Sequence, residues 1–207
     1  MKYHYDVEQR TDEWHALRLG RITGTSFTTM ANGTAKGRKT LVDTIVAERR
    51  LQRADDGYVN ADMVRGAEME AEAIARYEAE TFLSVRPVGF VSLNEFVGCS
   101  PDGLVGDDGG VEAKCPAKGR IHMGYINAGD DAWKAHKWQV QGSLWVTDRK
   151  WKDFISYFPC PATKDELFIC RVTPDDECFD KLESGMALCL KMIAEIEGAA
   201  NVNVPSD

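Results

Sequence analysis

The sequence predicts a single α/β domain that spans residues 1–207. Its 207 residues and 43% hydrophobic content suit one domain with a core of its own. Segments with helical periodicity lie on both sides of segments with β-type alternation. Glycine and proline fall at the ends of these segments rather than in a linker, and no internal repeat interrupts them. We therefore expect helices and strands to share one core.

Two helices joined by a polar loop are predicted in the first third of the chain. Asp12 is placed to cap a short helix that ends at Leu19. A polar loop then covers residues 32–39, in which TAKGRK forms a basic, flexible stretch, and Thr40 opens the next helix. A third helix is predicted over residues 65–82.

A charged β-hairpin is predicted in the middle of the chain. Runs typical of strands cover residues 85–93 and 96–100. Leu104–Val105, a GDDGG turn and Val111–Cys115 follow, and Pro116 stops the last run. The predicted hairpin therefore carries acidic and basic side chains close to a tight turn.

The second half predicts a helix over residues 132–146 and strands over 151–158 and 167–172. Thr173, followed by a proline, has the pattern of an N-cap, and Gly198 marks the expected end of a long helix. Apolar residues repeat along this helix at steps of three and four: Phe179, Leu182, Met186, Cys189, Ile193 and Ile196. Core packing is the interpretation that we favour, and a partner-binding face is the alternative.

Charge is distributed unevenly along the chain. The net charge is −8, yet residues 1–53 hold ten Lys and Arg against six Asp and Glu, and the remainder holds fifteen against twenty-seven. The first third is therefore the part suited to phosphate contacts, which basic side chains dominate. Carboxylates elsewhere could hold a divalent metal or simply favour solubility.

Several classes of protein are disfavoured by the composition. No apolar stretch approaches the roughly twenty residues that cross a bilayer, and residues 1–10 are charged and aromatic rather than like a secretory leader. The six cysteines are scattered without a C-x-x-C pair, which argues against a zinc site or a disulfide framework. We expect a cytoplasmic protein with free thiols and no membrane association.

The predicted hairpin brings together groups that suit metal-dependent hydrolysis. Glu112 and Lys114 project from the same face of a strand, whereas the residues between and beside them point into apolar packing. Asp102 arrives from the paired strand. Mg²⁺ prefers one or two carboxylates with carbonyl, water and phosphate oxygens, so Asp102, Glu112 and the Ala113 carbonyl could bind it. Lys114 could position or deprotonate water and offset charge on the phosphoryl oxygens. An ordinary Asp-Gly turn and an exposed ion pair remain the structural alternative.

Glu70 is a third candidate metal ligand. On a helical wheel it falls beside Ile74 and Tyr77, whereas Glu68 and Glu72 fall on the opposite, solvent-facing side. A carboxylate that faces a core is costly unless it is paired or coordinates an ion.

Polar residues elsewhere are weaker candidates. Gln139, on the predicted helix over 132–146, can hydrogen-bond a water or a phosphate, although amides are common on helix surfaces. His136 is more often a packing histidine than a catalyst. Near the N-terminus, Arg18, Thr25 and Ser26 surround two glycines and could form an anion pocket, or simply a capped helix end.

Five segments occur in one order between Asp12 and Trp145: W-H-x-L-R-L-G-x-I-T, G-x-x-x-E, S-P-D-G, E-x-K-C-P and Q-V-Q-x-S-x-W. Together they resemble the phage lambda exonuclease family, the YqaJ-like viral recombinase exonucleases of the PD-(D/E)xK nuclease superfamily. The resemblance implies a restriction-endonuclease-like fold, in which helices flank a mixed central sheet. It also implies a phage or prophage protein, in the cytoplasm of a bacterial host.

The resemblance also implies roles for particular residues. Glu70, Asp102, Glu112 and Ala113 would surround two Mg²⁺ ions, which Mn²⁺ could replace. Lys114 would be the catalytic lysine, and Gln139 would support the metal-bound water. Residues that would contact phosphate or line the strand path are Trp14, Arg18, Thr25 and Ser100. The family's pocket serine falls on Thr25 with Ser26 beside it, so either hydroxyl could contact the phosphate.

The function implied is processive 5′→3′ digestion of linear double-stranded DNA to mononucleotides and a 3′ overhang, by two-metal hydrolysis. The resemblance further implies a homotrimeric ring and a single-strand annealing protein as partner in recombination. Two alternatives stay open: an endonuclease on the same fold, and a non-catalytic module that binds DNA ends. An intact Asp102, Glu112 and Lys114 argue against the second.

Overall fold

A five-stranded sheet forms the centre of the molecule. The computed structural model describes residues 1–54, 61–160 and 164–202. The strand order is β2-β5-β6-β7-β8, and β6 and β7 run parallel while the other neighbours are antiparallel. The sheet is therefore mixed, as predicted. Its strands are β2 (Val85–Arg86), β5 (Gly103–Val105), β6 (Gly109–Lys114), β7 (Trp151–Tyr157) and β8 (Leu167–Val172).

A second, three-stranded sheet lies beside the first. Its antiparallel strands β1 (Lys2–His4), β3 (Phe90–Ser92) and β4 (Gly98–Cys99) have the order β1-β3-β4. The run predicted over residues 85–93 therefore divides between two sheets. Pro87 lies at the division, and because proline has no N–H it cannot continue a strand ladder.

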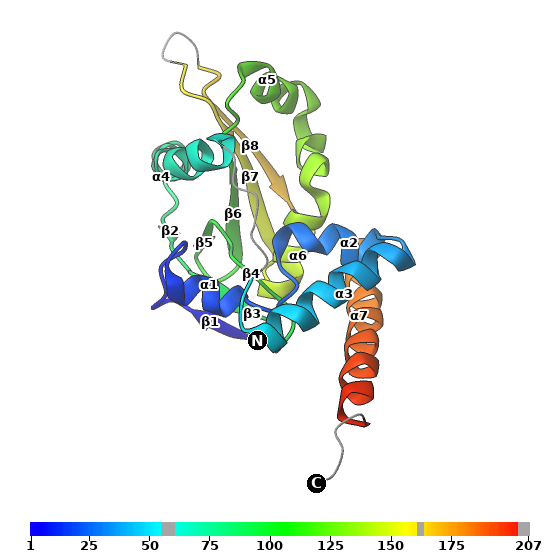
Figure 1. Cartoon of the computed structure of the whole chain (residues 1–207). Coiled ribbons are helices and arrows are strands. Elements are labelled where there is room, and N and C mark those ends of the chain that lie inside the picture. The colour runs from blue at the N-terminus through cyan, green and yellow to red at the C-terminus, as the bar shows by residue number, and fades with distance from the viewer. Residues whose placement is uncertain (55–60, 161–163, 203–207) are drawn as a thin grey trace.

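Helices cover both faces of the large sheet. Helix α4 (Ala61–Thr81) packs on one face, where Val111 and Ala113 point, and α6 (Lys137–Thr147) packs on the other (Figure 1). The chain crosses from β6 to the parallel β7 through α5 (Gly119–Ala128), the 3₁₀ segment η2 (Gly129–His136) and α6. Since side chains alternate along β6, Glu112 and Lys114 face the α6 side.

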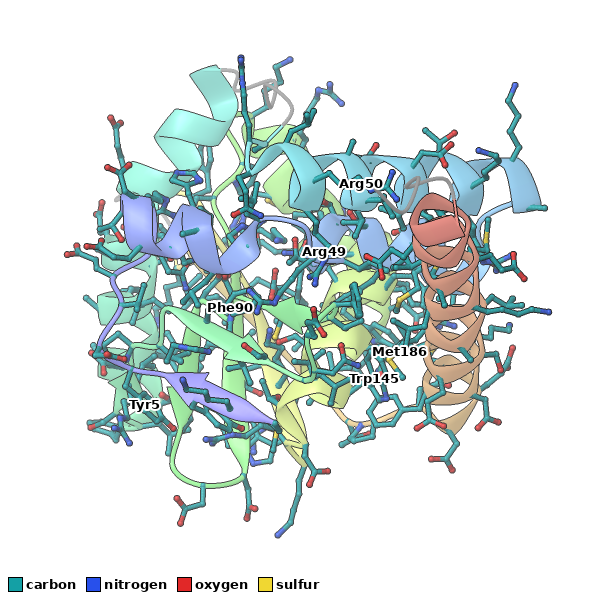
Figure 2. All side chains as sticks on the ribbon, turned by 60° about the horizontal axis from the view of Figure 1, so that its bottom comes forward. Tyr5, Arg49, Arg50, Phe90, Trp145 and Met186 are labelled. Carbon is teal, nitrogen blue, oxygen red and sulfur yellow. The ribbon has the colours of Figure 1, made fainter. Side chains whose placement is uncertain are left out.

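A second core lies between the small sheet and the helices α2 (Phe27–Asn32), α3 (Ala35–Leu51) and α7 (Asp176–Val202). The helix α1 (Asp12–Arg18) and the 3₁₀ segment η1 (Gly24–Ser26) contribute no buried residue to it. Leu182, Cys189 and Ile193 of α7 are buried in this core, so the apolar stripe of the C-terminal helix is a packing face. Figure 2 shows Met186 of α7 beside Trp145 of α6, and both pack against the same cluster.

The basic segment of residues 34–39 is helical rather than a loop, which corrects the sequence-based expectation. Helix α3 begins at Ala35 instead of Thr40, because the Thr34 hydroxyl accepts a hydrogen bond from the Gly37 N–H at 3.1 Å. This cap satisfies a backbone donor that the first turn leaves unpaired. Helix α1 likewise is capped by Thr11 rather than by Asp12.

Two other boundaries differ from prediction. The helix expected over residues 132–146 is divided between η2 and α6. A further helix, α5, comes before them in the chain and is separated from η2 by a break at Gly129, whose φ is +55°. Helix α7 begins after Asp175, whose side chain accepts a hydrogen bond from the Cys178 N–H at 2.9 Å, and it continues through Gly198. The cap at Asp175, the residue after the proline, therefore overrode the signal at Thr173.

All six cysteines are free thiols. Among the residues that the structure describes, no helix is long and apolar enough to cross a membrane.

Candidate active site

Asp102, Glu112 and Lys114 meet at the junction of β5 and β6. Asp102 immediately precedes β5, whose Gly103 pairs with Val111 of β6. The Asp102 Oδ2 accepts a hydrogen bond from the Ala113 N–H at 2.7 Å, and the Lys114 Nζ donates to Glu112 Oε1 at 2.8 Å. The antiparallel pairing thus places two carboxylates and an ammonium group on one side of the sheet.

The two carboxylates have opposite pKa shifts. Burial and the nearby Glu112 charge raise the pKa of Asp102 to about 7. Burial alone would raise the pKa of Glu112 as well, but the ammonium groups of Lys114 and Lys152 outweigh it and lower that pKa to about 2. Glu112 is therefore the firmly ionised carboxylate, and Asp102 retains a strong electrostatic preference for an additional cation.

Gln139 and His136 lie on the α6 side of this cluster. The Gln139 Oε1 accepts a hydrogen bond from the Lys114 Nζ at 3.3 Å, so Lys114 is held between Glu112 and Gln139. His136 hydrogen-bonds the Tyr125 hydroxyl at 2.8 Å and stacks on Phe154. Burial and the Lys114 charge lower the pKa of His136 to about 4, which keeps its imidazole neutral near pH 7.

Glu70 of α4 faces the same region but is paired. Its Oε2 lies 2.7 Å from a guanidinium nitrogen of Arg10, and the two side chains are 24% and 51% exposed. Glu70, Arg10 and Asp102 line one cavity of about 540 Å³. In the described part of the chain no three Asp, Glu, His or Cys side chains converge as a ready metal centre. Glu70 is therefore at the rim of the site rather than in its centre.

A second polar cluster joins α1 to the residues just before Asp102. The Ser100 hydroxyl accepts hydrogen bonds from Trp14 Nε1 at 2.8 Å and from an Arg18 guanidinium nitrogen at 3.3 Å. The Arg18 guanidinium lies over the Trp14 ring, 4.3 Å from its centroid, and burial lowers the Arg18 pKa. Ser100 precedes Asp102 by two residues, so this cluster adjoins the carboxylates.

Thr25 and Ser26 are not part of that hydrogen-bonded cluster. Both lie in η1, with Thr25 exposed and Ser26 half-buried. Within residues 1–54, no hydrogen bond joins either hydroxyl to Arg18. A phosphate contact from Thr25 or Ser26 stays a prediction.

Comparison with known proteins gives the family. The model of the YqaJ-like viral recombinase domain matches residues 13–150, which is more than half of the chain. The chain belongs to this family. The recognised motifs and the mixed fold agree with that assignment. No curated protein sequence is similar enough to count as a match.

This YqaJ-like domain is similar to solved exonuclease structures. The alkaline exonuclease from Laribacter hongkongensis is 30% identical, with a TM-score of 0.77 over 94% of this chain and 100% of that one. A structure of the same exonuclease in complex with dAMP is 32% identical, with a TM-score of 0.79 over 93% and 100% of the two chains. A phage-related exonuclease from Haemophilus somnus 129PT shares the fold at 16% identity, with a TM-score of 0.65 over 96% and 97%.

The donor groups of this YqaJ-like domain fit a hard divalent cation. Asp102 and Glu112 supply carboxylate oxygens on one side of the sheet, and Ala113 lies between Glu112 and Lys114 on β6. Oxygen donors of this kind are those that Mg²⁺ prefers. The raised pKa of Asp102 points the same way, because a bound cation would relieve its repulsion from Glu112.

Sequence reasoning missed three residues of the site. Lys152 and Ser143 lie behind Glu112, and Arg10 pairs with Glu70. Lys152 could have been found from β7, where Lys152, Phe154 and Ser156 alternate with residues that face α4. A lysine on the inner face of a buried strand is unusual unless it is paired. Nothing in the sequence pointed to Arg10.

Proposed function

We propose that this chain is a Mg²⁺-dependent exonuclease that digests linear double-stranded DNA from 5′ ends. The observation that carries the proposal is the junction of β5 and β6, where Asp102, Glu112 and Lys114 meet beside the Arg18 cluster. Family membership and the likeness to an alkaline exonuclease support a DNA-hydrolysing role.

Two Mg²⁺ ions would be held by oxygens of Asp102, Glu112, Ala113 and Glu70, and Mn²⁺ could take their place. When bound, they would lower the pKa of water and offset charge on the phosphoryl oxygens. Glu70 would have to leave Arg10 to join them, because the two side chains are in contact at 2.7 Å.

The protein's own groups would orient the reaction. Lys114 is held by Glu112 and Gln139 with its ammonium group beside both carboxylates. From that position it can position the attacking water and stabilise the negative charge that develops on phosphorus-bound oxygens. Gln139 fixes Lys114, which reduces the reorganisation needed in the transition state.

The cluster of Trp14, Arg18 and Ser100 would bind phosphate next to the metal site, with Thr25 or Ser26 as a further hydroxyl donor. A planar guanidinium suits two phosphate oxygens, and a terminal phosphate carries more charge than a diester. This preference would select 5′ ends, release mononucleotides and leave a 3′ overhang. Such an overhang is a substrate for a single-strand annealing protein in the cytoplasm of a phage-infected or lysogenic bacterium.

The decisive experiment compares linear and covalently closed circular duplexes, with and without Mg²⁺. We expect release of mononucleotides from linear DNA only in Mg²⁺, and no nicking of closed circles. Nicking of the circles would identify an endonuclease on the same fold. Retention of linear DNA without cleavage in either Mg²⁺ or Mn²⁺ would identify a non-catalytic end-binding module.

A further inference from the structure

A second buried lysine contacts Glu112 from behind the site. Lys152 of β7 lies on the same face of the sheet as Glu112, whose partner in the parallel ladder is Phe154. The Lys152 Nζ is 2.8 Å from Glu112 Oε2 and 2.8 Å from the Ser143 hydroxyl, and its side chain is 3% exposed. Lys114 contacts the other oxygen, Oε1. Each oxygen of Glu112 is therefore paired with a different ammonium group.

The surroundings of Lys152 are built to hold it. Its ladder partner is Gly110, and the Lys152 side chain lies across this position: a Cβ added to Gly110 would be in ordinary van der Waals contact with Lys152 Cε, at 3.6 Å. Ser143 is buried in α6, and its hydroxyl accepts a hydrogen bond from the Lys152 ammonium group. A buried ammonium group is costly unless such partners are fixed, which argues that Lys152 is placed for Glu112 and not by chance.

The two lysines differ in accessibility. Lys114 is 21% exposed and also reaches Gln139, whereas Lys152 is enclosed between the sheet and α6. A cation that approaches Glu112 from solvent can replace Lys114 at Oε1 far more readily than it can displace Lys152 from Oε2. Lys152 therefore acts through Glu112 as a positioning residue.

We propose that Lys152 holds Oε2 and leaves Oε1, which the more exposed Lys114 can release, as the one Glu112 oxygen open to a cation, and that it thereby makes the site prefer Mg²⁺ over Ca²⁺. The physical basis is that Ca²⁺ accepts more oxygens and often takes both oxygens of one carboxylate, whereas Mg²⁺ takes six ligands in a strict octahedron and retains water. The inference rests on the metal site of the proposed function.

The test is calorimetric titration of Mg²⁺ and of Ca²⁺ into the DNA-free protein, for wild type and Lys152→Met. Methionine keeps the length of the side chain but frees Glu112 Oε2. We expect affinity for Ca²⁺ to rise relative to Mg²⁺ by about tenfold, the effect of exchanging one hydrogen bond to a charged group for a metal bond. Lys152→Arg, which keeps the charge, should restore the wild-type ratio. Lys150→Met, which removes an exposed lysine next to the same strand, should leave the ratio unchanged.

Thermal unfolding of each variant distinguishes this role of Lys152 from a purely structural one. A purely structural role would lower the stability without changing the ratio of Ca²⁺ affinity to Mg²⁺ affinity. If Lys152→Met fails to fold, Ser143→Ala tests the inference instead. Loss of this hydrogen-bond partner should hold Lys152 less firmly at Glu112 and shift the affinity ratio in the same direction by a smaller factor. A folded variant with the wild-type ratio overturns the inference alone. A wild type that binds neither ion overturns the metal-dependent function and the inference with it.

Discussion

At the residue scale, the site depends on a balance between two carboxylates, Glu112 buried and Asp102 half-buried, and two ammonium groups. Glu112 accepts one hydrogen bond from Lys114 and one from Lys152, and Asp102 accepts one from the backbone N–H of Ala113. The opposite face of β6 is apolar, with Val111 packed among residues of α4 and β7. Substitution of one of these charged residues should therefore affect catalysis or cation binding more than it affects packing of the core.

Lys114→Ala should abolish turnover while folding and DNA binding are largely retained. The lysine is partly exposed, and in the proposed role it would stabilise charge that develops only in the transition state; groups of this kind contribute about 10²–10⁴-fold. The measurement is the rate of nucleotide release from linear duplex in Mg²⁺, with circular dichroism and a binding assay. Lys134→Ala, at an exposed ion pair, is the matched control. Turnover near the wild-type rate would exclude Lys114 from catalysis.

Arg10→Gly should lower the Mg²⁺ concentration that gives half-maximal activity. Arg10 forms an ion pair with Glu70 and adds positive charge beside the proposed metal site, and its φ of +73° suits glycine without strain. The change should be at most about fivefold, because exposed ion pairs contribute roughly 1 kcal/mol or less. Arg76→Ala, which breaks ion pairs elsewhere on α4, is the control for a Mg²⁺ titration of the rate. A higher Mg²⁺ requirement would show that Arg10 assists the site.

At the scale of elements, the placement of α1 determines which groups meet the carboxylates. Thr11 caps the helix, and Trp14 and Arg18, four residues apart, extend from one side of it to Ser100. The preceding Gln9 donates to the Pro101 carbonyl at 2.8 Å, which ties this segment to the residue before Asp102. Helix α1 is therefore fixed at both ends to the segment between β4 and β5 that leads into Asp102.

Arg18→Lys should reduce the preference for 5′-phosphorylated ends. Lysine keeps the charge but lacks the planar fork that fits two phosphate oxygens and stacks on Trp14. The measurement is a time course on linear duplexes with 5′-phosphate and 5′-hydroxyl ends, together with the length digested per binding event. Equal rates on both ends for the wild type would mean that another element sets direction.

Helix α7 should contribute strongly to stability through its buried stripe. Leu182 is fully buried in the core that α7 shares with α2 and α3, so Leu182→Ala should lower the free energy of unfolding by about 2–5 kcal/mol. Leu188→Ala, at a position on the same helix that is 49% exposed, should change it little. Urea unfolding of both variants measures the difference. Equal losses would contradict the assignment of Leu182 to the core and of Leu188 to the surface of α7.

At the scale of the whole molecule, charge is the main constraint on DNA binding. The net charge of −8 opposes association with a polyanion, and only the first third of the chain has an excess of basic residues. A closed ring around the duplex would retain DNA by topology where electrostatic affinity is weak. This physical argument adds to the resemblance that implies a homotrimer.

Light scattering on the purified protein should give a mass about three times the 23.0 kDa of the chain. We further expect long tracts to be digested per binding event in the presence of a DNA trap. A monomer that still digests processively would contradict the ring.

The sequence by itself determined which side chains of a strand or helix share a face. Alternation on the predicted strand put Glu112 and Lys114 on one face, and the structure has them there with Asp102 beside them. Local signals also gave the strand at residues 167–172 and the buried stripe of α7. These features depend on periodicity and on neighbours in sequence, which a single chain displays directly.

Only the tertiary structure decided what depends on distant segments. The ladder between β6 and β7 brings Lys152 to Glu112 across forty residues of sequence, and the chain before α1 brings Arg10 to Glu70 across sixty. Helices α3 and α7 also begin at caps formed by Thr34 and Asp175, rather than at Thr40 and Thr173, where the sequence predicted their starts. Periodicity shows which face a side chain occupies, but not which partner lies opposite it. That partner is fixed by strand register and by packing between elements.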